Sequence, residues 1–176
     1  AGLVGVLLTL LYMVAYYRKL SAVIIVGLVV WAGLVYVLST YISRETNYAF
    51  TIAGATGIIV SIGVTVDTYI VFFERLKDEI RSGRTLVNAA PRAFSATWKT
   101  ILAANTVALM SAVVLFFLSV GSVRGFALYL GMTTIADVVV FYFFTRPMLY
   151  LLAGTRWFDS SNPKSIGVGT AIGGAQ

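Results

Sequence analysis

Five long apolar runs account for most of this chain, and they constrain its fold more than any other feature. Each run is longer than the roughly 10–14 apolar residues of a helix buried in a soluble core, and most of them approach or exceed the roughly 20 needed to cross a bilayer. The sequence therefore predicts an all-α membrane protein with a transmembrane bundle over residues 1–152. The expected helices are about 1–17, 20–42, 49–73, 99–118 and 126–152.

The composition excludes several other classes of protein. Hydrophobic residues make up 59% of the chain and charged residues 11%, which is far from the balance of a soluble domain. Cysteine and histidine are both absent, so disulfides, thiol chemistry and histidine-based catalysis or metal binding are not expected. We therefore expect no enzyme, no catalytic residue and no metal site. The net charge of +6 is explained by membrane topology, so we expect contact with the lipid bilayer and none with nucleic acid.

The distribution of charge predicts how the chain is inserted. Basic residues gather in the turn after the first run, in the connection 74–94 and in the tail 153–176, whereas the opposite side has only Arg44 and Arg124. By the positive-inside rule the first group is cytoplasmic. We therefore expect the N-terminus of this fragment outside and its C-terminus in the cytoplasm. Because the first residue already lies inside an apolar run, we also expect a longer polypeptide upstream.

The connection 74–94 is predicted to be amphipathic and helical. Its first part continues the third helix into the cytoplasm, Gly83 is a candidate for ending that helix, and Thr85 can cap a short second helix over 86–94. The apolar side of the connection is expected to lie at the membrane interface. The tail 153–176 is rich in glycine, serine and other small residues, and it is expected to be flexible.

An acid, Asp67, lies inside the third apolar run. A charged residue at the centre of a membrane helix costs roughly 2.5–3.5 kcal/mol on insertion scales, so the position needs a reason. The acid is either permanently paired with another helix or it is a proton site, because burial penalises the charged form of a carboxylate. The proton site is favoured, since intramembrane acids are usually functional. Small and polar residues dominate the upper part of its helical face, so that face is expected to contact protein: Thr56, Val60, Gly63, Ile70, Val71 and Glu74.

A second acid, Asp137, lies inside the fifth run, one turn after Thr133 and Thr134. Those hydroxyls could satisfy a purely structural carboxyl, so a structural and a relay role both stay open. Thr68 and Asn105 are predicted as polar neighbours of the relay that could hold water. Asn105 also lies in a run of small residues, a pattern that more often serves helix packing than chemistry.

Two motifs resemble those of a known family. GVTVDTYIVFFER, residues 63–75, resembles the fourth-helix signature of the SecD family, G-x-A-V-D-A-N-V-L-I-F-E-R. VLFFLSVGSVRGFALYLG, residues 114–131, resembles that family's V-L-F-F-x-G-x-G-x-V-K-G-F-A segment, and Thr145-Arg146 its closing T-R. The resemblance covers nearly the whole chain. The signature residues that match are Gly63, Val66, Asp67, Phe73, Glu74 and Arg75.

The resemblance implies the second to sixth helices of a SecD subunit, within the resistance-nodulation-division superfamily. Such a subunit lies in the bacterial cytoplasmic membrane and assists protein export with the proton motive force, without a cofactor. Its implied partners are SecF, the SecYEG channel, the SecA ATPase and preprotein substrates. The resemblance also implies that Asp67 is the intramembrane proton site.

The chain departs from the family pattern at two places. Thr68-Tyr69 replaces Ala-Asn after the acid, and Ala103-Ala104-Asn105 stands where many members have Asp-Ala-Asn. Asp137 could take over the role of the acid missing there. Two rival functions remain: half of a proton-coupled small-molecule or lipid exporter of the same superfamily, and a purely structural subunit whose acids only hold helices together.

Overall fold

The computed structural model describes residues 2–46 and 51–154, and these residues are helical with no strand. The predicted all-α fold is thus confirmed. Most of the predicted flexible tail lies outside the described residues. The helices are α1 (Gly2–Tyr17), α2 (Ser21–Thr46), α3 (Ile52–Arg81), α4 (Leu86–Leu118), α5 (Ser122–Val140) and α6 (Arg146–Ala153). A 3₁₀ turn, Arg18–Leu20, joins α1 to α2, and a π-helical turn, Phe141–Thr145, joins α5 to α6.

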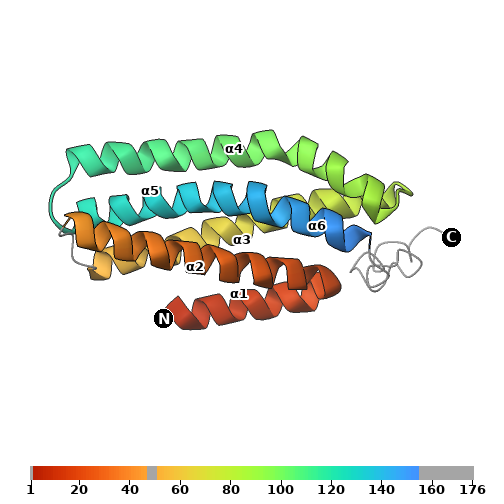
Figure 1. Ribbon diagram of the computed structural model, residues 1–176, viewed down its shortest axis with the longest axis horizontal. Helices are drawn as coiled ribbons and strands as arrows, with labels where there is room; N and C mark the ends of the chain where they lie inside the picture. The colour runs from red at the N-terminus through yellow and green to blue at the C-terminus, as the bar shows by residue number, and fades with distance from the viewer. Residues whose placement is uncertain (1, 47–50, 155–176) are drawn as a thin grey trace.

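The long helices run side by side in one bundle (Figure 1). The most extensive contacts join α3, α4 and α5, while α2 packs on α5 and α1 packs on α2 at the edge. The α1–α2 turn, the α3–α4 connection and the end of α6 all lie at one end of the bundle (Figure 1). The segments predicted to be cytoplasmic are therefore placed together, and we call this the connection end.

Four helical stretches are long and apolar enough to cross a membrane: Ser21–Arg44, Ile52–Arg81, Leu86–Leu118 and Ser122–Ala153. The last of these runs through α5, the π-helical turn and α6 without a break. The predicted first helix is present as α1, but it has only 16 residues.

The structure differs from the sequence prediction in the connection. Gly83 follows the end of α3 with a positive φ of 87°, as a glycine at this position of a helix end should. Thr85 precedes the next helix as predicted, but residues 86–94 are the first turns of the 33-residue α4 and form no separate helix. Pro91 lies inside α4 and removes one backbone hydrogen bond. The helix nevertheless continues, because its first turns are packed against the core through Leu86, Ala89, Ala90, Ala93 and Phe94.

Aromatic rings fill the core toward the connection end. The Phe72 ring of α3 meets the Phe141 ring of the π-helical turn edge to face, with centroids 5.4 Å apart. The Phe94 ring of α4 stacks on the same Phe141 ring at 5.9 Å. Because lipid offers no hydrophobic drive for helix association, such close ring packing is an important source of stability here.

Toward the opposite end, α3 approaches α5 closely at Gly57. A Cβ atom added there would lie 2.9 Å from the Phe126 carbonyl oxygen and 3.3 Å from the Leu130 nitrogen, both backbone atoms. Small residues allow this kind of approach between membrane helices. The contact fixes α3 against α5 and so positions the polar residues of α3 that follow one to three turns later.

We predict that Gly57→Ala destabilises the protein by about 1–3 kcal/mol, because the methyl group would push two backbones apart. The thermal unfolding midpoint of the purified protein in detergent measures this. The matched control is Gly33→Ala, since a Cβ at Gly33 meets nothing within 4 Å. Equal midpoints for the two variants would contradict the close α3–α5 contact.

Candidate functional site

A buried polar cluster lies between α3, α4 and α5, around the carboxyl group of Asp137. Asp137 is 3% exposed. The Thr68 hydroxyl on α3 lies 3.3 Å from Asp137 Oδ2 and 3.2 Å from the Val64 carbonyl oxygen, so it can donate to either. Thr65 of α3 and Asn105 of α4 also lie beside the carboxyl group. Two helices thus bring polar side chains to an acid on a third.

The cluster has unused hydrogen-bonding capacity. Asn105 donates its amide nitrogen to the Ile101 carbonyl at 2.9 Å, but its Oδ1 has no partner among the described residues, nor does Thr65 Oγ1. Over residues 2–46 and 51–154, none of the ion pairs includes Asp137. Buried polar atoms of this kind can hold a water molecule or a protonated acid, and an ionised carboxylate here would be costly.

The Thr133 and Thr134 hydroxyls, which could have satisfied a structural Asp137, bond elsewhere. Thr133 donates to the Tyr129 and Leu130 carbonyl oxygens at 2.8 and 2.9 Å, and Thr134 donates to the Leu130 carbonyl at 2.8 Å. Both side chains thus bond to their own helix, as threonine commonly does in apolar surroundings. The polar partners of Asp137 come instead from α3 and α4.

Asp67 lies on the other side of α3, and its side chain is exposed. We call the exposed stripe around it the Asp67 face. The sequence predicts that protein covers this face, yet within the described part of the chain the face stays open. Thr68 and Asn105 were expected near the relay, and the structure brings both to Asp137 rather than to Asp67. The Asp67 face consists of Thr56, Val60, Gly63, Asp67 and Val71.

The remaining signature residues anchor α3. Val66 and Phe73 are buried in the core. Glu74 accepts hydrogen bonds from the Tyr17 hydroxyl at 3.0 Å and from Lys77 Nζ at 3.3 Å. The Lys77 side chain is itself buried, with Nζ 4.3 Å from the Tyr17 ring centroid. Cation–π contact and the ion pair with Glu74 together compensate for burying this charge, and they fasten α1 to α3.

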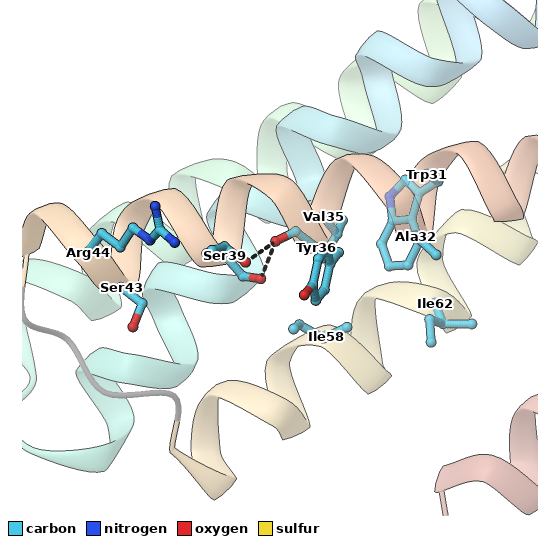
Figure 2. A pocket seen from close by; sticks show the side chains of 10 residues that line it. Trp31, Ala32, Val35, Tyr36, Ser39, Ser43, Arg44, Ile58 and Ile62 are labelled. Carbon is cyan, nitrogen blue, oxygen red and sulfur yellow. Dashed lines mark hydrogen bonds between the residues drawn. The ribbon is translucent and has the colours of Figure 1, made fainter.

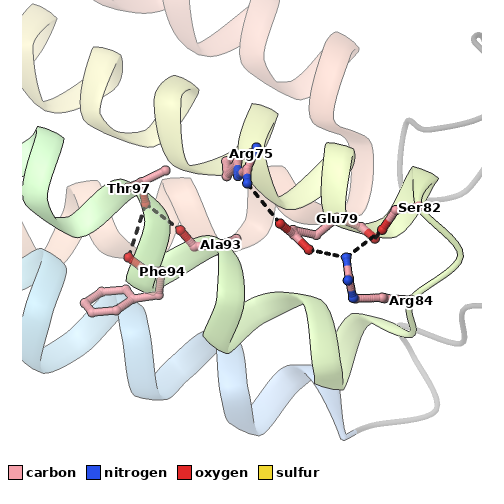
Figure 3. Close-up of polar contacts among 7 residues, drawn as sticks. All are labelled: Arg75, Glu79, Ser82, Arg84, Ala93, Phe94 and Thr97. Atoms are coloured by element: carbon pink, nitrogen blue, oxygen red, sulfur yellow. Dashed lines mark hydrogen bonds and ion pairs between the residues drawn. The ribbon is translucent and has the colours of Figure 1, made fainter.

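Arg75, the last signature residue, takes part in a small ionic network. It lies 3.2 Å from Glu79, whose other carboxylate oxygen lies 2.6 Å from Arg84 (Figure 3). Arg84 also donates to the Ser82 hydroxyl at 2.8 Å. The network ties the last turn of α3 to the start of the connection, which leads into α4.

Sequence reasoning missed a second buried link, which joins α3 to the π-helical turn after α5. The Tyr69 hydroxyl lies 3.0 Å from Thr145 Oγ1, at the end of the π-helical turn. Gly27 of α2 leaves room for this tyrosine, because a Cβ there would lie 2.1 Å from its hydroxyl oxygen. Helical spacing could have placed Thr65 and Tyr69 on the face of Thr68, whereas nothing in the sequence indicates a π-helical turn, a feature frequent at functional sites.

Comparison with known proteins adds an independent line of evidence. Residues 1–167 match the model of the MMPL family. The chain is 43% identical over 173 residues to the protein translocase subunit SecD of Streptomyces coelicolor, covering 95% of this chain and 30% of that protein. It is 31% identical over 159 residues to the protein translocase subunit SecDF of Bacillus subtilis, covering 90% and 21%.

Solved structures give the same picture. A crystal structure of SecDF from Thermus thermophilus, described as a translocon-associated membrane protein, superposes with a TM-score of 0.79 at 33% identity, over 86% of this chain and 21% of that one. A crystal structure of SecDF in a super-membrane-facing form gives a TM-score of 0.77 at 32% identity, over 86% and 20%. The chain therefore spans less than a third of the length of these relatives.

We predict that Asp137→Ala destabilises the protein by about 1–3 kcal/mol, because Thr68 loses its carboxyl partner and a cavity opens between three helices. Asp137→Asn keeps the shape and the acceptor oxygen, so its unfolding midpoint should stay close to that of the wild type. Thermal unfolding in detergent compares the two. If alanine is as stable as asparagine, the polar cluster contributes nothing to helix packing.

Proposed function

The chain belongs to the MMPL family, and from its similarity to SecD and SecDF subunits along most of its length we propose that it is the membrane part of an accessory subunit of the bacterial Sec preprotein translocase. This subunit uses the proton motive force to promote protein export across the cytoplasmic membrane, and it performs no enzymatic reaction. The observation that supports the proposal most directly is Asp67, an acid in a SecD-like signature on an uncovered face of a spanning helix.

The Asp67 face requires a partner. An exposed carboxylate in hydrocarbon is costly. The Asp67 face is narrow, and its small residues Gly63 and Thr56 would let another helix approach closely. The relatives are more than three times as long as the segment they share with this chain. We infer that the helices of SecF, fused or separate, cover the Asp67 face and shield the acid from lipid.

Asp67 acts in this proposal as the proton acceptor, and Asp137 as an auxiliary acid. Asp67 is on one side of α3, and Asp137 of α5 lies against another side. There Thr68, the residue after Asp67, bonds to Asp137. A rotation or shift of α3 at Asp67 therefore also changes the contact with Asp137. Protonation removes the cost of a buried charge and so alters which arrangement of α3 is favoured. One proton moving down a potential of about 100 mV supplies about 2.3 kcal/mol for this shift.

The orientation follows from charge. The connection end carries Arg75, Arg81, Arg84 and Lys77 on α3 and its connection, and we place this end in the cytoplasm by the positive-inside rule. The described N-terminus then starts from the outer side. In the same proposal the outer side meets emerging preproteins, while the assembly as a whole works with the SecYEG channel and the SecA ATPase.

A small-molecule or lipid exporter of the same superfamily would use a similar buried acid. It is not favoured, because the relatives that match this chain are translocase subunits. A purely structural role for Asp67 is the rival that experiment must address.

We predict that Asp67→Asn in the full-length protein folds and assembles but loses the stimulation of export by the proton gradient, because asparagine cannot take up a proton. Preprotein import into inverted membrane vesicles, with and without an uncoupler, measures this. Asp78→Asn is the control, since Asp78 is a half-exposed acid on the same helix, paired with Arg81. Export by Asp67→Asn that keeps its normal uncoupler sensitivity would rule out the proton role.

We further predict that a cysteine replacing Thr56 forms a crosslink with SecF helices. A cysteine replacing Val107, which is 65% exposed on α4, serves as the lipid-facing control. Both are introduced into a cysteine-free version of the full-length protein. A reagent with a maleimide at one end and a photoreactive benzophenone at the other, followed by irradiation and mass spectrometry of the linked peptides, detects the product. Crosslinking at both positions to the same extent, or at neither, would contradict a partner on the Asp67 face.

A further inference from the structure

Tyr69 of α3 occupies a closed slot between α2 and the π-helical turn. Its side chain is 1% exposed. Its ring stacks on Phe73 of its own helix and meets the Phe141 ring of the π-helical turn edge on, with centroids 6.3 and 5.9 Å apart. On α2, a side chain at Gly27 would collide with the tyrosine hydroxyl. The slot therefore fixes the ring, and the hydroxyl reaches Thr145 Oγ1 at 3.0 Å.

The helix α2 restrains α3 mainly at this slot. It packs chiefly on α5 and approaches the backbone of α3 at few points. In the half of the bundle opposite the connection end, a groove of about 630 Å³ lies between α2 and α3, lined by Trp31 and Ile58 and ending at Arg44 (Figure 2). Ile58 is nine residues from Asp67, which at 100° per residue places this α2–α3 groove on the side of α3 opposite to the Asp67 face. Within the described residues, Tyr69 thus has an important part in holding α3 to its neighbours.

Three consecutive residues of α3 meet three different surroundings. Successive residues of a helix are turned by 100°, so Asp67 lies on the open face, Thr68 against α5 and Tyr69 against the π-helical turn. Thr68 has a second acceptor, the Val64 carbonyl oxygen at 3.2 Å. The hydroxyl of a tyrosine is too far from its own backbone to bond there, unlike that of a threonine. The Tyr69 contact is therefore the harder of the two to replace when α3 moves.

The length of the tyrosine side chain amplifies any rotation of α3. Cα atoms lie about 2.3 Å from the axis of an α-helix, and a tyrosine hydroxyl lies at least about 6 Å from it. A rotation of roughly 20° moves a Cα atom by less than about 1 Å but the hydroxyl by about 2 Å. That is enough to break a hydrogen bond of 3.0 Å. After a small movement of α3, Thr145 must therefore either follow Tyr69 or lose it.

Thr145 is the last residue of the π-helical turn, so its position depends on the backbone there. The Arg146 N–H donates to the Phe141 carbonyl oxygen, a bond that spans five residues instead of four. The α-helical pattern of backbone bonds is a second arrangement available to the same residues, and single π-helical turns are frequent at functional sites. The turn leads directly into α6 at the connection end (Figure 1). A displacement of Thr145 is therefore passed to α6.

We propose that Tyr69 is a positioning residue that couples the protonation state of Asp67 to the π-helical turn through Thr145. When Asp67 changes between its neutral and ionised forms, α3 takes a different position, and the tyrosine hydroxyl carries that displacement to the turn and to α6. The carboxyl group of Asp137 is the titratable neighbour that acts on Tyr69 from α5. The inference rests on the proposed function, since it takes Asp67 as the proton acceptor.

Hydrogen exchange of the backbone amides of residues 141–146, followed by mass spectrometry, tests this coupling in the full-length protein. Asp67→Asn replaces the acid by a neutral group of nearly the same shape, and it should change the exchange rate of these amides by about threefold. Tyr69→Phe removes only the hydroxyl and keeps the ring in its slot, so in this background Asp67→Asn should leave the rate unchanged. Thr145→Val removes the other hydroxyl and should give the same result as Tyr69→Phe.

Asp78→Asn is the matched control, because Asp78 is paired with Arg81 near the end of the same helix, and it should not alter this exchange. Two results would overturn the proposal: no effect of Asp67→Asn on the turn, or an effect that survives Tyr69→Phe. The second would mean that Tyr69 only packs. Exchange does not report export, so the two proposals fail separately. If the turn responds as expected while export by Asp67→Asn keeps its uncoupler sensitivity, the proton role fails and the link between α3 and the turn stands.

Discussion

A carboxyl group in a membrane must be sheltered from hydrocarbon, and the two sides of α3 meet this constraint in different ways. On the inner side, Thr68 and its neighbours surround the buried Asp137 of α5. On the outer side, Asp67 has no shelter within the described residues. The same helix therefore completes the polar interior of this bundle and leaves an acid uncovered among the described residues. The constraint supports the proposal that this bundle works beside a second set of helices.

The rest of the fold holds α3 at two points and leaves polar groups between them. Gly57 sets the close approach to α5 in one half of the bundle. In the other half, Glu74 links α3 to Tyr17 of α1 and pairs with the buried Lys77 of its own helix. Between these anchors lie Thr65, Asp67 and Thr68, with the π-helical turn of the facing helix one turn beyond Asp137. Protonation of an acid there would act on a part of the bundle in which only a few polar contacts join the helices. Each of these contacts could be exchanged for another.

Two surfaces on either side of α3 differ in charge and polarity. The Asp67 face and the α2–α3 groove lie on opposite sides of α3, one with an acid and small residues, the other with an apolar trench ending at Arg44. An acid inside a membrane indicates a specific neighbour, because hydrocarbon does not favour it there. A protein partner suits the first surface.

The sequence by itself determined the all-α class, the apolar runs, the grouping of basic residues and the two intramembrane acids. These features are local: hydropathy accumulates residue by residue, and helical hydrogen bonds join residues four apart. Gly83 and Thr85 at the helix ends were predictable for the same reason. The SecD-like signature also predicted Asp67 as the proton site, which stays a prediction, while Glu74 and Arg75 make their contacts toward the connection end of α3.

Only the tertiary structure decided which side of each helix is covered. Asp67 and Thr68 are adjacent in the chain, yet a rotation of 100° places one on the open face and the other against Asp137. Likewise, whether Thr133 or Thr68 satisfies Asp137, and whether residues 86–94 form a separate helix, depended on contacts with residues far away in the sequence. Such contacts involve the relative placement of whole helices, which no local pattern of residues encodes.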